Sequence, residues 1–447
     1  MRVTLVQPCL GRRPGERYLR TWQMEPLPLA VLAGLTPPDV EVRLVDDRLE
    51  AIPYDAPTDL VAMSVETYTA RRAYQIASEF RARGVPVVMG GFHAMLAPDE
   101  VARYAESVVV GEAEALWAEV IDDHRHGRGR KLYRAASRPR LGSARPDRRI
   151  YRGKRYLPVG LVEAGRGCPY HCEFCAIHSA YGPSRTPRPV DAVVQDVLAA
   201  SAERTLTFIV DDNLGADRAA AFELLGALAA HRRPWVTQCS IQAALDEDWA
   251  ARLAAAGCIG VLIGFESLDR GTLRAMGKGF NVPDAYRSAV RTLRRHRIGV
   301  YGTFVLGYDG DGPDALLPAV DFAREERLFL AAFAHLVPFP GTPLHRRLAA
   351  EGRLLHERWW LDPDYRFGQV AYRPARMTGA ELRAACLDAR RRFYSWASIA
   401  ARAPGNLGTP RAALAFAVAN LLHRRELSQR DGHPLGDATF AGPLLEA

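Results

Sequence analysis

Short apolar runs alternate with stretches of helical periodicity in the first 120 residues of the chain. The apolar runs lie at residues 3–6, 42–45, 60–64, 85–89 and 107–110, and the stretches that predict helices lie at 27–35, 70–83 and 98–104. Strands that alternate with helices predict a doubly wound parallel sheet with helices on both faces. Because such sheets bind ligands at the carboxyl ends of their strands, the candidate ligand loops are 64–68, 90–93 and 111–114.

A second and longer alternation begins at residue 161. The predicted strands lie at 161–163, 206–210, 235–239, 260–265, 300–306 and 333–337, and the predicted helices at 190–202, 216–231, 246–256, 282–295 and 314–325. Serial β/α units of this kind predict a parallel barrel or partial barrel. The chemistry of such a barrel lies at the carboxyl ends of its strands.

The segments outside these two series predict a linker and a helical extension. Residues 121–160 are polar, rich in arginine and interrupted by prolines, which is the composition of a linker, although Tyr151, Tyr156 and Leu157 can anchor part of it on a neighbouring domain. The sequence therefore predicts domains at 1–120 and 161–350, a linker at 121–160, and an extension at 351–447.

Within that extension, Thr378 and Glu381 form a capping-box pattern that starts a helix to about residue 398, and a further apolar helix lies at 411–422. Cys386 lies on the apolar face of the first of these helices, so it is expected in a core. The aromatic-rich stretch 359–368 has two interpretations: it shapes a substrate pocket, or it packs as a lid on the barrel.

Composition limits the class of protein. With 447 residues, 48% of them hydrophobic, the chain is long enough for two or three globular domains. No apolar run approaches the roughly 20 residues that cross a bilayer, and the first residues lack the order of a signal peptide. Seven cysteines, an odd number with three in a metal-binding spacing, favour a reducing cytoplasm without disulfides.

The net charge of +8 comes almost entirely from arginine, because Lys131, Lys154 and Lys278 are the only lysines. This skew is typical of coding in a GC-rich genome rather than of selection for phosphate binding. We therefore expect no nucleic-acid partner.

The sequence Gly165–Cys175, GRGCPYHCEFC, carries the strongest chemical signal. Cys168, Cys172 and Cys175 have the spacing C-x-x-x-C-x-x-C, and thiolates select iron–sulfur clusters or zinc. A structural zinc site or an electron-transfer cluster normally has four protein ligands, whereas three cysteines leave one iron of a four-iron cluster open.

Two other interpretations of the cysteines stay open at this point. One is a zinc site completed by His171 or His178. The other is a ferredoxin-like cluster with a remote fourth ligand, for which Cys239 and Cys258 offer no partner motif.

The cysteine spacing, with Phe174 just before the last cysteine, resembles the loop of the radical S-adenosylmethionine (SAM) superfamily. The resemblance implies a partial barrel of six β/α units and a [4Fe-4S] cluster held by Cys168, Cys172 and Cys175. It also implies that SAM binds the open iron and is cleaved to a 5′-deoxyadenosyl radical, with a flavodoxin or ferredoxin as electron donor.

The same resemblance assigns candidate SAM contacts at the strand ends. Asp211, Asp212 and Asn213 stand where the family holds the amino group of SAM, and a carboxylate facing an ammonium is the physical reason. They also fit an N-cap cluster for the next helix. Gln242, after the third predicted strand, is a candidate polar contact. In the GVLIGFES segment, Gly264 is a candidate adenine contact and Glu266 a candidate ribose contact. Arg188 is a candidate partner of the SAM carboxylate.

The first domain resembles the Rossmann-like cobalamin-binding domain that precedes many radical SAM domains, through the segments 26–35, 42–47, 87–94 and 108–114. The resemblance implies that Gly90, Gly91 and Gly111 let the backbone approach a corrin ring. His93 and Glu112 are further candidate contacts, but the D-x-H-x-x-G motif that supplies a cobalt ligand is absent. The alternative is a domain that only packs. The segment 338–354 also resembles one in cobalamin-binding radical SAM proteins.

These resemblances imply an enzyme that uses SAM, a [4Fe-4S] cluster and cobalamin to methylate a carbon atom, with two SAM consumed per turnover, one as methyl donor and one as radical source. The substrate class is a small molecule or natural product. A radical rearrangement, ring contraction or oxidation without methyl transfer is the first alternative. A non-enzymatic iron–sulfur or cobalamin sensor is the second.

Overall fold

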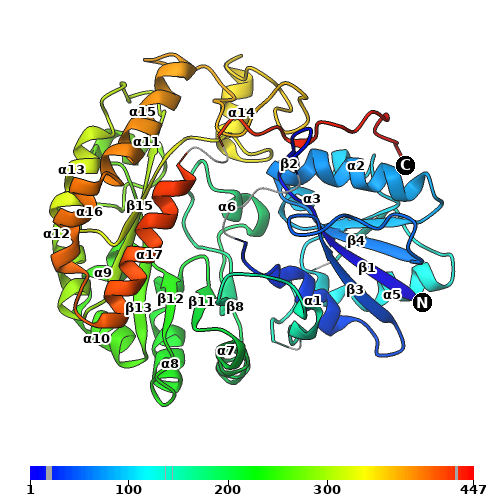
Figure 1. The fold of residues 1–447 in the computed structure, drawn as a ribbon, viewed down its shortest axis with the longest axis horizontal. Helices are drawn as coiled ribbons and strands as arrows, with labels where there is room; N and C mark the ends of the chain where they lie inside the picture. Colours follow the sequence, from blue (N-terminus) through cyan, green and yellow to red (C-terminus); the bar gives the residue numbers. More distant parts are fainter. Residues whose placement is uncertain (17–22, 136, 143, 428–430) are drawn as a thin grey trace.

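The computed structural model describes residues 1–16, 23–135, 137–142, 144–427 and 431–447. Two α/β units lie side by side, each built on a six-stranded sheet, with the short helix α6 (Ala176–Tyr181) between them (Figure 1). Every strand pair in both large sheets is parallel. The predicted α/β fold class is confirmed.

The first sheet has the strand order β3-β1-β4-β5-β6-β7. Its strands are β1 (Arg2–Gln7), β3 (Glu41–Asp46), β4 (Leu60–Ser64), β5 (Val87–Gly90), β6 (Ser107–Val110) and β7 (Leu132–Arg134). The strands are apolar on both faces because helices cover both faces. The order of the strands reverses between β1 and β4, and in doubly wound sheets the ligand crevice lies at the carboxyl ends at such a point.

Helices cover the two faces of this sheet in two groups. The helices α1 (Leu27–Leu35) and α5 (Trp117–Arg125) share one core with the sheet. The helices α2 (Ala70–Arg81), α3 (Phe92–Leu96) and α4 (Pro98–Val101) share the other. The predicted helix 98–104 is thus only the single turn of α4, which Pro98 opens. After Val101 the chain continues in tighter turns, in which the Arg103 and Tyr104 N–H groups donate to carbonyls three residues earlier.

The segment predicted as a linker is partly structured. Residues 132–134 form β7, the edge strand of the first sheet, and a 3₁₀ turn lies at Arg148–Tyr151. The strand was missed because Tyr133 is its one buried residue, too little to give a periodic signal. The expected anchors do bind the first unit: Tyr151 is buried, and the Tyr156 hydroxyl donates to Asp46 over 2.8 Å.

The second sheet follows the chain order, β8-β11-β12-β13-β14-β15. Its strands are β8 (Val159–Glu163), β11 (Leu206–Val210), β12 (Trp235–Gln238), β13 (Cys258–Glu266), β14 (Gly299–Leu306) and β15 (Leu330–His335). Because β8 and β15 each have one neighbour, the barrel is open between them. Buried residues alternate with half-buried ones along β11 and β14, so one face packs on helices and the other faces inward.

The outer helices of the barrel are α7 (Val190–Glu203), α8 (Arg218–Ala229), α9 (Ile241–Leu245), α10 (Glu247–Ala255), α11 (Arg270–Ala275), α12 (Pro283–Arg295) and α13 (Leu317–Glu325). Further 3₁₀ turns lie at Thr67–Thr69, Ala113–Ala115, Leu214–Ala216 and Ala403–Gly405, and a short antiparallel pair joins β9 (Gly165–Arg166) to β10 (Thr186–Pro187). The predicted last strand, 333–337, begins three residues earlier than expected, at Leu330.

After the barrel come α14 (Pro343–Ala350), α15 (Gly379–Phe393), α16 (Trp396–Arg402) and α17 (Pro410–Glu426). The Thr378–Glu381 capping box at the start of α15 is confirmed, and Cys386 is buried in the barrel core as predicted. The end of the chain returns to the first unit (Figure 1), where β16 (Gly436–Asp437) pairs with β2 (Gly11–Arg12). In the described part of the chain, no helix combines the length and apolarity that crossing a bilayer requires.

The aromatic-rich stretch 359–368 packs on the first unit and not on the barrel. Trp359, Trp360 and Tyr365 are buried in the core of the first unit, under α2 and α3. The prediction of a lid on the barrel was wrong in that respect, because apolar residues reveal that a segment packs but not against which of two cores it packs.

A buried arginine attaches the C-terminal helices to the barrel. Arg402, at the end of α16, donates to the Leu328 carbonyl over 2.9 Å and to Asn420 Oδ1 on α17 over 2.8 Å. Its guanidinium also lies 3.8 Å from the ring centroid of Phe393. Burial, with no paired acid to offset it, lowers the pKa of Arg402 to about 10. This side chain therefore links α15, α16, α17 and the start of β15.

We expect Arg402→Ala to loosen α16 and α17, because several buried carbonyl and amide groups lose their donor at a cost of about 2 kcal/mol or more. Hydrogen–deuterium exchange should show faster exchange in peptides from both helices while the first sheet is unchanged. Arg411→Ala, at an exposed position on α17, is the matched control and should leave the exchange unaltered. Equal protection in the two variants would contradict this role.

Candidate functional site

The three motif cysteines lie at the carboxyl edge of the barrel sheet, on the loop from β8 and β9 to α6 (Figure 1). Cys172 is buried, and Cys168 and Cys175 are half-buried. Burial raises the pKa of Cys168 and Cys175, and it raises the pKa of Cys172 to about 12. Repulsion from neighbouring thiolates adds to burial at Cys168 and Cys172, and the Asp212 carboxylate adds to it at Cys175. Thiolates in such a place need a bound cation to persist.

Three distant segments hold this loop through Glu173. The Glu173 carboxylate accepts from Arg347 Nε of α14 over 2.7 Å and from the Tyr308 hydroxyl over 3.1 Å. Its backbone N–H donates to the Met276 carbonyl over 2.9 Å. The segment that resembles one in cobalamin-binding proteins, 338–354, thus supports the cysteine loop through α14.

A buried ion pair lies beside the cysteines. Lys278 Nζ is 2.6 Å from Glu266 Oε1. Burial alone lowers the pKa of Lys278, but the Coulombic attraction of Glu266 and of Cys172 outweighs burial and raises it. Lys278 in turn lowers the pKa of Cys172, against the larger effect of burial. A permanent positive charge therefore stands next to the thiol that is least exposed.

Glu266 has strained backbone geometry. Its φ of +64° is in the left-handed region, and the pairing of β13 with β14 shifts register between Gly264 and Glu266. The Asn281 side chain holds this bulge by donating to the Gly264 carbonyl over 2.9 Å. Bulges and strained residues of this kind re-aim side chains at functional sites.

Gly264 does not leave the open space that was predicted for an adenine ring. A side chain at this position would lie 2.3 Å from Glu266 Oε1 and 2.7 Å from Lys278 Nζ. The room that this glycine makes is filled by the ion pair, and its contact with an adenine ring stays a prediction.

The loop after β11 meets the cysteine loop. Asp212 Oδ2 accepts from the Gly167 N–H over 2.6 Å, and Asn213 Nδ2 lies 4.0 Å from Cys168 Sγ. Asp211 is instead paired with Arg185, over 2.5 Å. Burial raises the pKa of Asp212 to about 6. The N-cap alternative was wrong for these residues, because the side chain that caps α8 is Asp217.

Several polar atoms around the loop are buried without a partner. They include Asn213 Oδ1, Arg185 Nη1 and Gln242 Oε1. Gln242, after β12, donates through Nε2 to the Phe280 carbonyl over 2.6 Å, and the Phe280 ring stacks on Tyr170 of the cysteine loop. Unpaired buried polar atoms are costly, so these atoms fit a site that a polar ligand completes.

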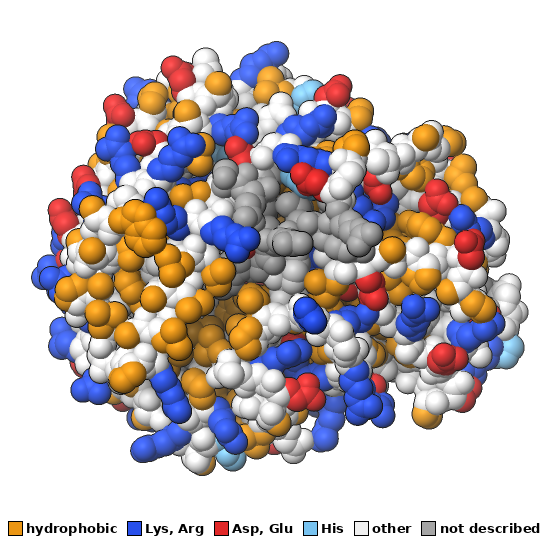
Figure 2. Space-filling model, viewed as in Figure 1, with side chains coloured by type: hydrophobic (Ala, Val, Ile, Leu, Met, Phe, Trp, Pro, Cys, Tyr) orange, Lys and Arg blue, Asp and Glu red, His pale blue; other side chains and the backbone are white. Residues whose placement is uncertain are grey.

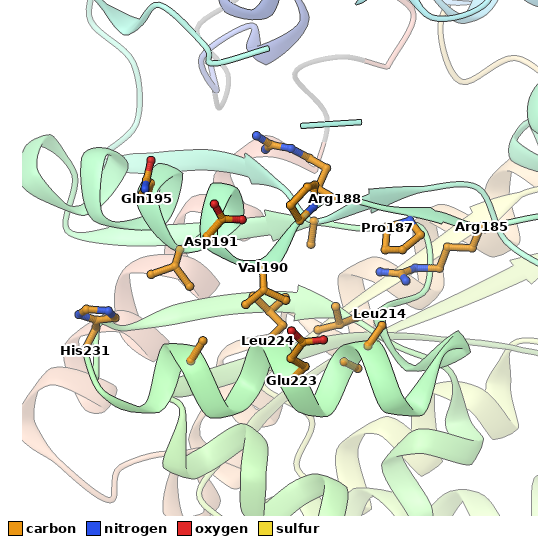
Figure 3. A pocket seen from close by; sticks show the side chains of 16 residues that line it. Arg185, Pro187, Arg188, Val190, Asp191, Gln195, Leu214, Glu223, Leu224 and His231 are labelled. Carbon is orange, nitrogen blue, oxygen red and sulfur yellow. The ribbon is translucent and has the colours of Figure 1, made fainter. Parts of the chain in front are cut away.

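Arg188 and Phe174 are each held by contacts within the barrel unit. Arg188 is buried in an ion pair with Asp196 of α7 over 2.8 Å, so its predicted contact with a SAM carboxylate was wrong. Phe174 packs on the barrel core. Figure 3 shows Arg185 and Arg188 lining a groove of about 700 Å³ between α7 and α8.

The predicted residues of the first sheet differ in what surrounds them. Gly111, after β6, has a φ of +104° and open space where a side chain would stand. Gly91, with a φ of +93°, is packed against the backbone of Val65, and Gly90 makes only ordinary contacts with Val109. Of these three glycines, Gly111 has the room that a bulky ligand needs.

His93 and Glu112 are both occupied within the protein. His93 is fully buried, with Nδ1 3.2 Å from Thr67 Oγ1 and Nε2 3.1 Å from Glu100. The prediction of His93 as a cofactor contact was wrong, because its neighbours occupy both ring nitrogens. Glu112 accepts from Arg138 Nε over 2.7 Å.

The carboxyl edges of the two sheets face each other across the cysteine loop. Arg166, two residues before Cys168, pairs with Glu114 of the first sheet over 2.5 Å and with Glu163 of β8 over 2.6 Å. The rings of Phe92 on α3 and Tyr181 on α6 have centroids 5.7 Å apart. A ligand at Gly111 would thus lie on the side of the first sheet that faces the cysteines.

The arrangement of the three thiols fits a four-iron cluster better than a site for a single metal ion. Among the described residues, no three His, Cys, Asp or Glu side chains are placed to hold one metal ion. The thiolates of a four-iron cluster each bind a different iron, so they need not converge on one point. Three thiols, with Lys278 and Asn213 nearby to stabilise negative charge, fit such a cluster.

Sequence reasoning missed Lys278, Arg166 and Glu173 as parts of this site. Lys278 could have been noticed, since it is one of only three lysines in a chain whose other basic residues are almost all arginines. Arg166 and Glu173 lie inside the cysteine motif, but their partners are 52 and 174 residues away. Pairings over such separations leave no periodic trace.

Comparison with known proteins places these features in context. Residues 162–323 match the family model described as the radical SAM superfamily. The bacteriochlorophyllide d C-12(1)-methyltransferase of Chlorobaculum tepidum is 29% identical over 391 residues, which are 85% of each chain. The hopanoid C-2 methylase of Rhodopseudomonas palustris is 28% identical over 75% of this chain and 66% of its own.

A solved structure has the same fold over nearly the whole chain. The radical S-adenosylmethionine methyltransferase TsrM from Kitasatospora setae, with cobalamin and a [4Fe-4S] cluster bound, superposes with a TM-score of 0.66 at 19% identity. The match covers 95% of this chain and 98% of that one. The two-unit architecture is therefore shared, including the first sheet.

We expect Lys278→Met to raise the pKa of Cys172, because Lys278 lowers it in the native protein. In metal-free protein at a fixed pH near 8.5, alkylation of Cys172 should slow about tenfold for each pKa unit. Glu266→Gln should lower the pKa of Cys172 and speed its alkylation, since Glu266 raises that pKa in the native protein. Lys131→Met is the control. Equal Cys172 rates in all variants, with Cys386 as the internal standard, would contradict the assignment.

Proposed function

We propose, since the chain belongs to the radical SAM superfamily through residues 162–323, that it transfers a methyl group to a carbon atom of a small organic substrate with the help of cobalamin. The observation that supports this most is the position of the cysteine loop. It lies at the barrel edge that faces the carboxyl end of the first sheet, bridged by Arg166.

The [4Fe-4S] cluster and SAM belong to the radical SAM domain. Cys168, Cys172 and Cys175 would hold the cluster, and Lys278 offers positive charge beside it. When bound, cluster and SAM supply a 5′-deoxyadenosyl radical that abstracts hydrogen. The protein positions the reactants and excludes water.

Polar groups beside the cysteine loop are proposed to bind SAM. The candidates are Asp212, Asn213, Gln242 and Glu266, and two of them carry a buried oxygen without a partner, Asn213 Oδ1 and Gln242 Oε1. Asp211 acts at one remove, since its contacts are with Arg185 and the Asn213 N–H. Its role is to hold the loop after β11 in place.

Cobalamin is proposed for the carboxyl edge of the first sheet. Gly111 is open to a ligand there, and the fold match extends over this unit to TsrM, a protein solved with cobalamin. His93 is excluded as a cobalt ligand by its burial and its two partners. Methyl transfer is supported by the names of the relatives, which include two enzymes that methylate carbon positions.

The organisation into domains at 1–120, 161–350 and 351–447 stays a proposal, with the change that β7 extends the first unit to residue 134. A cytoplasmic location fits seven cysteines that are all free of disulfides. The electron donor is proposed as an acidic flavodoxin or ferredoxin, since the chain is basic and Pro169 and His171 are exposed beside the cysteines.

Each single variant Cys168→Ala, Cys172→Ala and Cys175→Ala should abolish reductant-dependent formation of 5′-deoxyadenosine from SAM, because the cluster loses a ligand. The product is measured by liquid chromatography after anaerobic reconstitution. Cys386→Ala, a change at a free cysteine in the barrel core, is the control and should retain activity. Undiminished 5′-deoxyadenosine in any of the three variants would refute the cluster assignment.

A further inference from the structure

Exposed apolar side chains are concentrated in one part of the C-terminal extension. Among the described residues ten large apolar side chains are exposed, and five of them fall within residues 396–421. They are Trp396, Leu407, Leu414, Val418 and Leu421, of which Leu414 is 65% and Trp396 60% exposed. Scattered exposed apolar residues are ordinary, but such a concentration marks an interaction surface.

Three of these residues lie on a single face of the helix α17. Leu414, Val418 and Leu421 are spaced i, i+4 and i+7, so they form a stripe along the helix. The opposite face carries Phe416 and Asn420, both buried, and Asn420 is held by Arg402. Figure 2 shows apolar side chains gathered where Figure 1 places α16 and α17. The stripe therefore belongs to a firmly attached helix.

The helix that carries this stripe is positively charged. Residues Pro410–Glu426 contain three arginines and one acidic residue, Glu426. Arg411 and Arg425 are exposed on the striped face, near its two ends. The Arg424 guanidinium lies 4.8 Å from the centre of the Trp396 ring. An apolar stripe with an arginine rim and a tryptophan is what an anionic lipid surface binds.

The same helix borders the inside of the barrel. The His423 ring of α17 lies 6.0 Å from the ring of Tyr301, a half-buried residue of β14. Phe208, Val236 and Leu262 are also half-buried on the inward faces of their strands. Figure 2 shows a hollow with apolar walls immediately beside the α17 patch, over β11 and β12 of Figure 1. An apolar molecule leaving a membrane at α17 would meet this hollow first.

We propose that the α16–α17 face docks on an anionic lipid bilayer, and that an apolar substrate enters the open barrel from that surface. The docking stands on exposure, charge and helix geometry alone. The entry of substrate rests on the proposed function. The arginine rim favours anionic lipid over a second copy of this basic chain, because two copies would repel each other.

The test is flotation of the full-length, cluster-reconstituted protein with lipid vesicles. Vesicles of phosphatidylcholine with one quarter phosphatidylglycerol should bind the protein, and pure phosphatidylcholine should bind it less. The triple variant Leu414→Glu, Val418→Glu, Leu421→Glu should lower the bound fraction at least tenfold. The matched control, Leu245→Glu, Ile259→Glu, Val282→Glu, alters exposed apolar residues elsewhere and should bind like the native protein.

A second variant tests the charged rim. Arg411→Glu with Arg425→Glu should weaken binding to anionic vesicles, and added salt should weaken native binding in the same way. SAM cleavage without substrate serves as the check of folding, and it should be equal in all variants. It also separates the two proposals, since a chain that floats but never cleaves SAM would refute the enzyme and not the docking.

Three results would overturn the docking proposal. The first is that the native protein does not float with anionic vesicles. The second is that the triple variant floats as well as the matched control. The third is that light scattering shows a native dimer that the triple variant dissociates, with flotation unaffected, in which case the face binds a second copy of the chain.

Discussion

The structure depends on how one short loop is held between two sheets. Three thiols must stay close together, although burial raises the pKa of each. The loop is held from the first sheet by Arg166 with Glu114 and from α14 by Arg347 with Glu173. Burial of Arg166 opposes its charge, but the two glutamates outweigh burial and raise its pKa. Since the Arg166–Glu114 pair crosses between the two units, the relative position of the two sheets and the geometry of the cysteines are coupled.

The sequence predicted the fold well wherever apolar residues recur at a regular helix or strand spacing over a whole element. The strands and helices of both units follow their apolar spacing, and the open barrel follows from six β/α units in chain order. Weak or ambiguous signals failed. The strand β7 carries one buried residue, and the aromatic stretch 359–368 looked equally suited to a pocket or a barrel lid, yet packs on the first unit. Hydrophobicity states that a segment is buried, and only tertiary structure states where.

In the candidate site, too, features set by local sequence were predictable and features set by tertiary contacts were not. The cysteine spacing is local, so it was readable, whereas Lys278 acts on Cys172 from more than a hundred residues away. Gly264 and His93 stood in suitable sequence contexts, but in the structure their surroundings are filled by an ion pair and by Thr67 and Glu100. The apolar residues of α17 were read as a helix. That they face outward, beside arginines and an apolar hollow, is visible only in three dimensions (Figure 2).

The central claim is that two cofactor sites face each other across the cysteine loop. The most direct test is to purify the protein anaerobically from cells supplied with hydroxocobalamin, reconstitute the cluster, and measure both bound cobalamin and the electron spin relaxation of cob(II)alamin. The account predicts close to one cobalamin per chain, with faster relaxation once the cluster is reduced. A protein that keeps its cluster and cleaves SAM but retains no cobalamin, or whose cobalamin does not respond to the cluster, would contradict it.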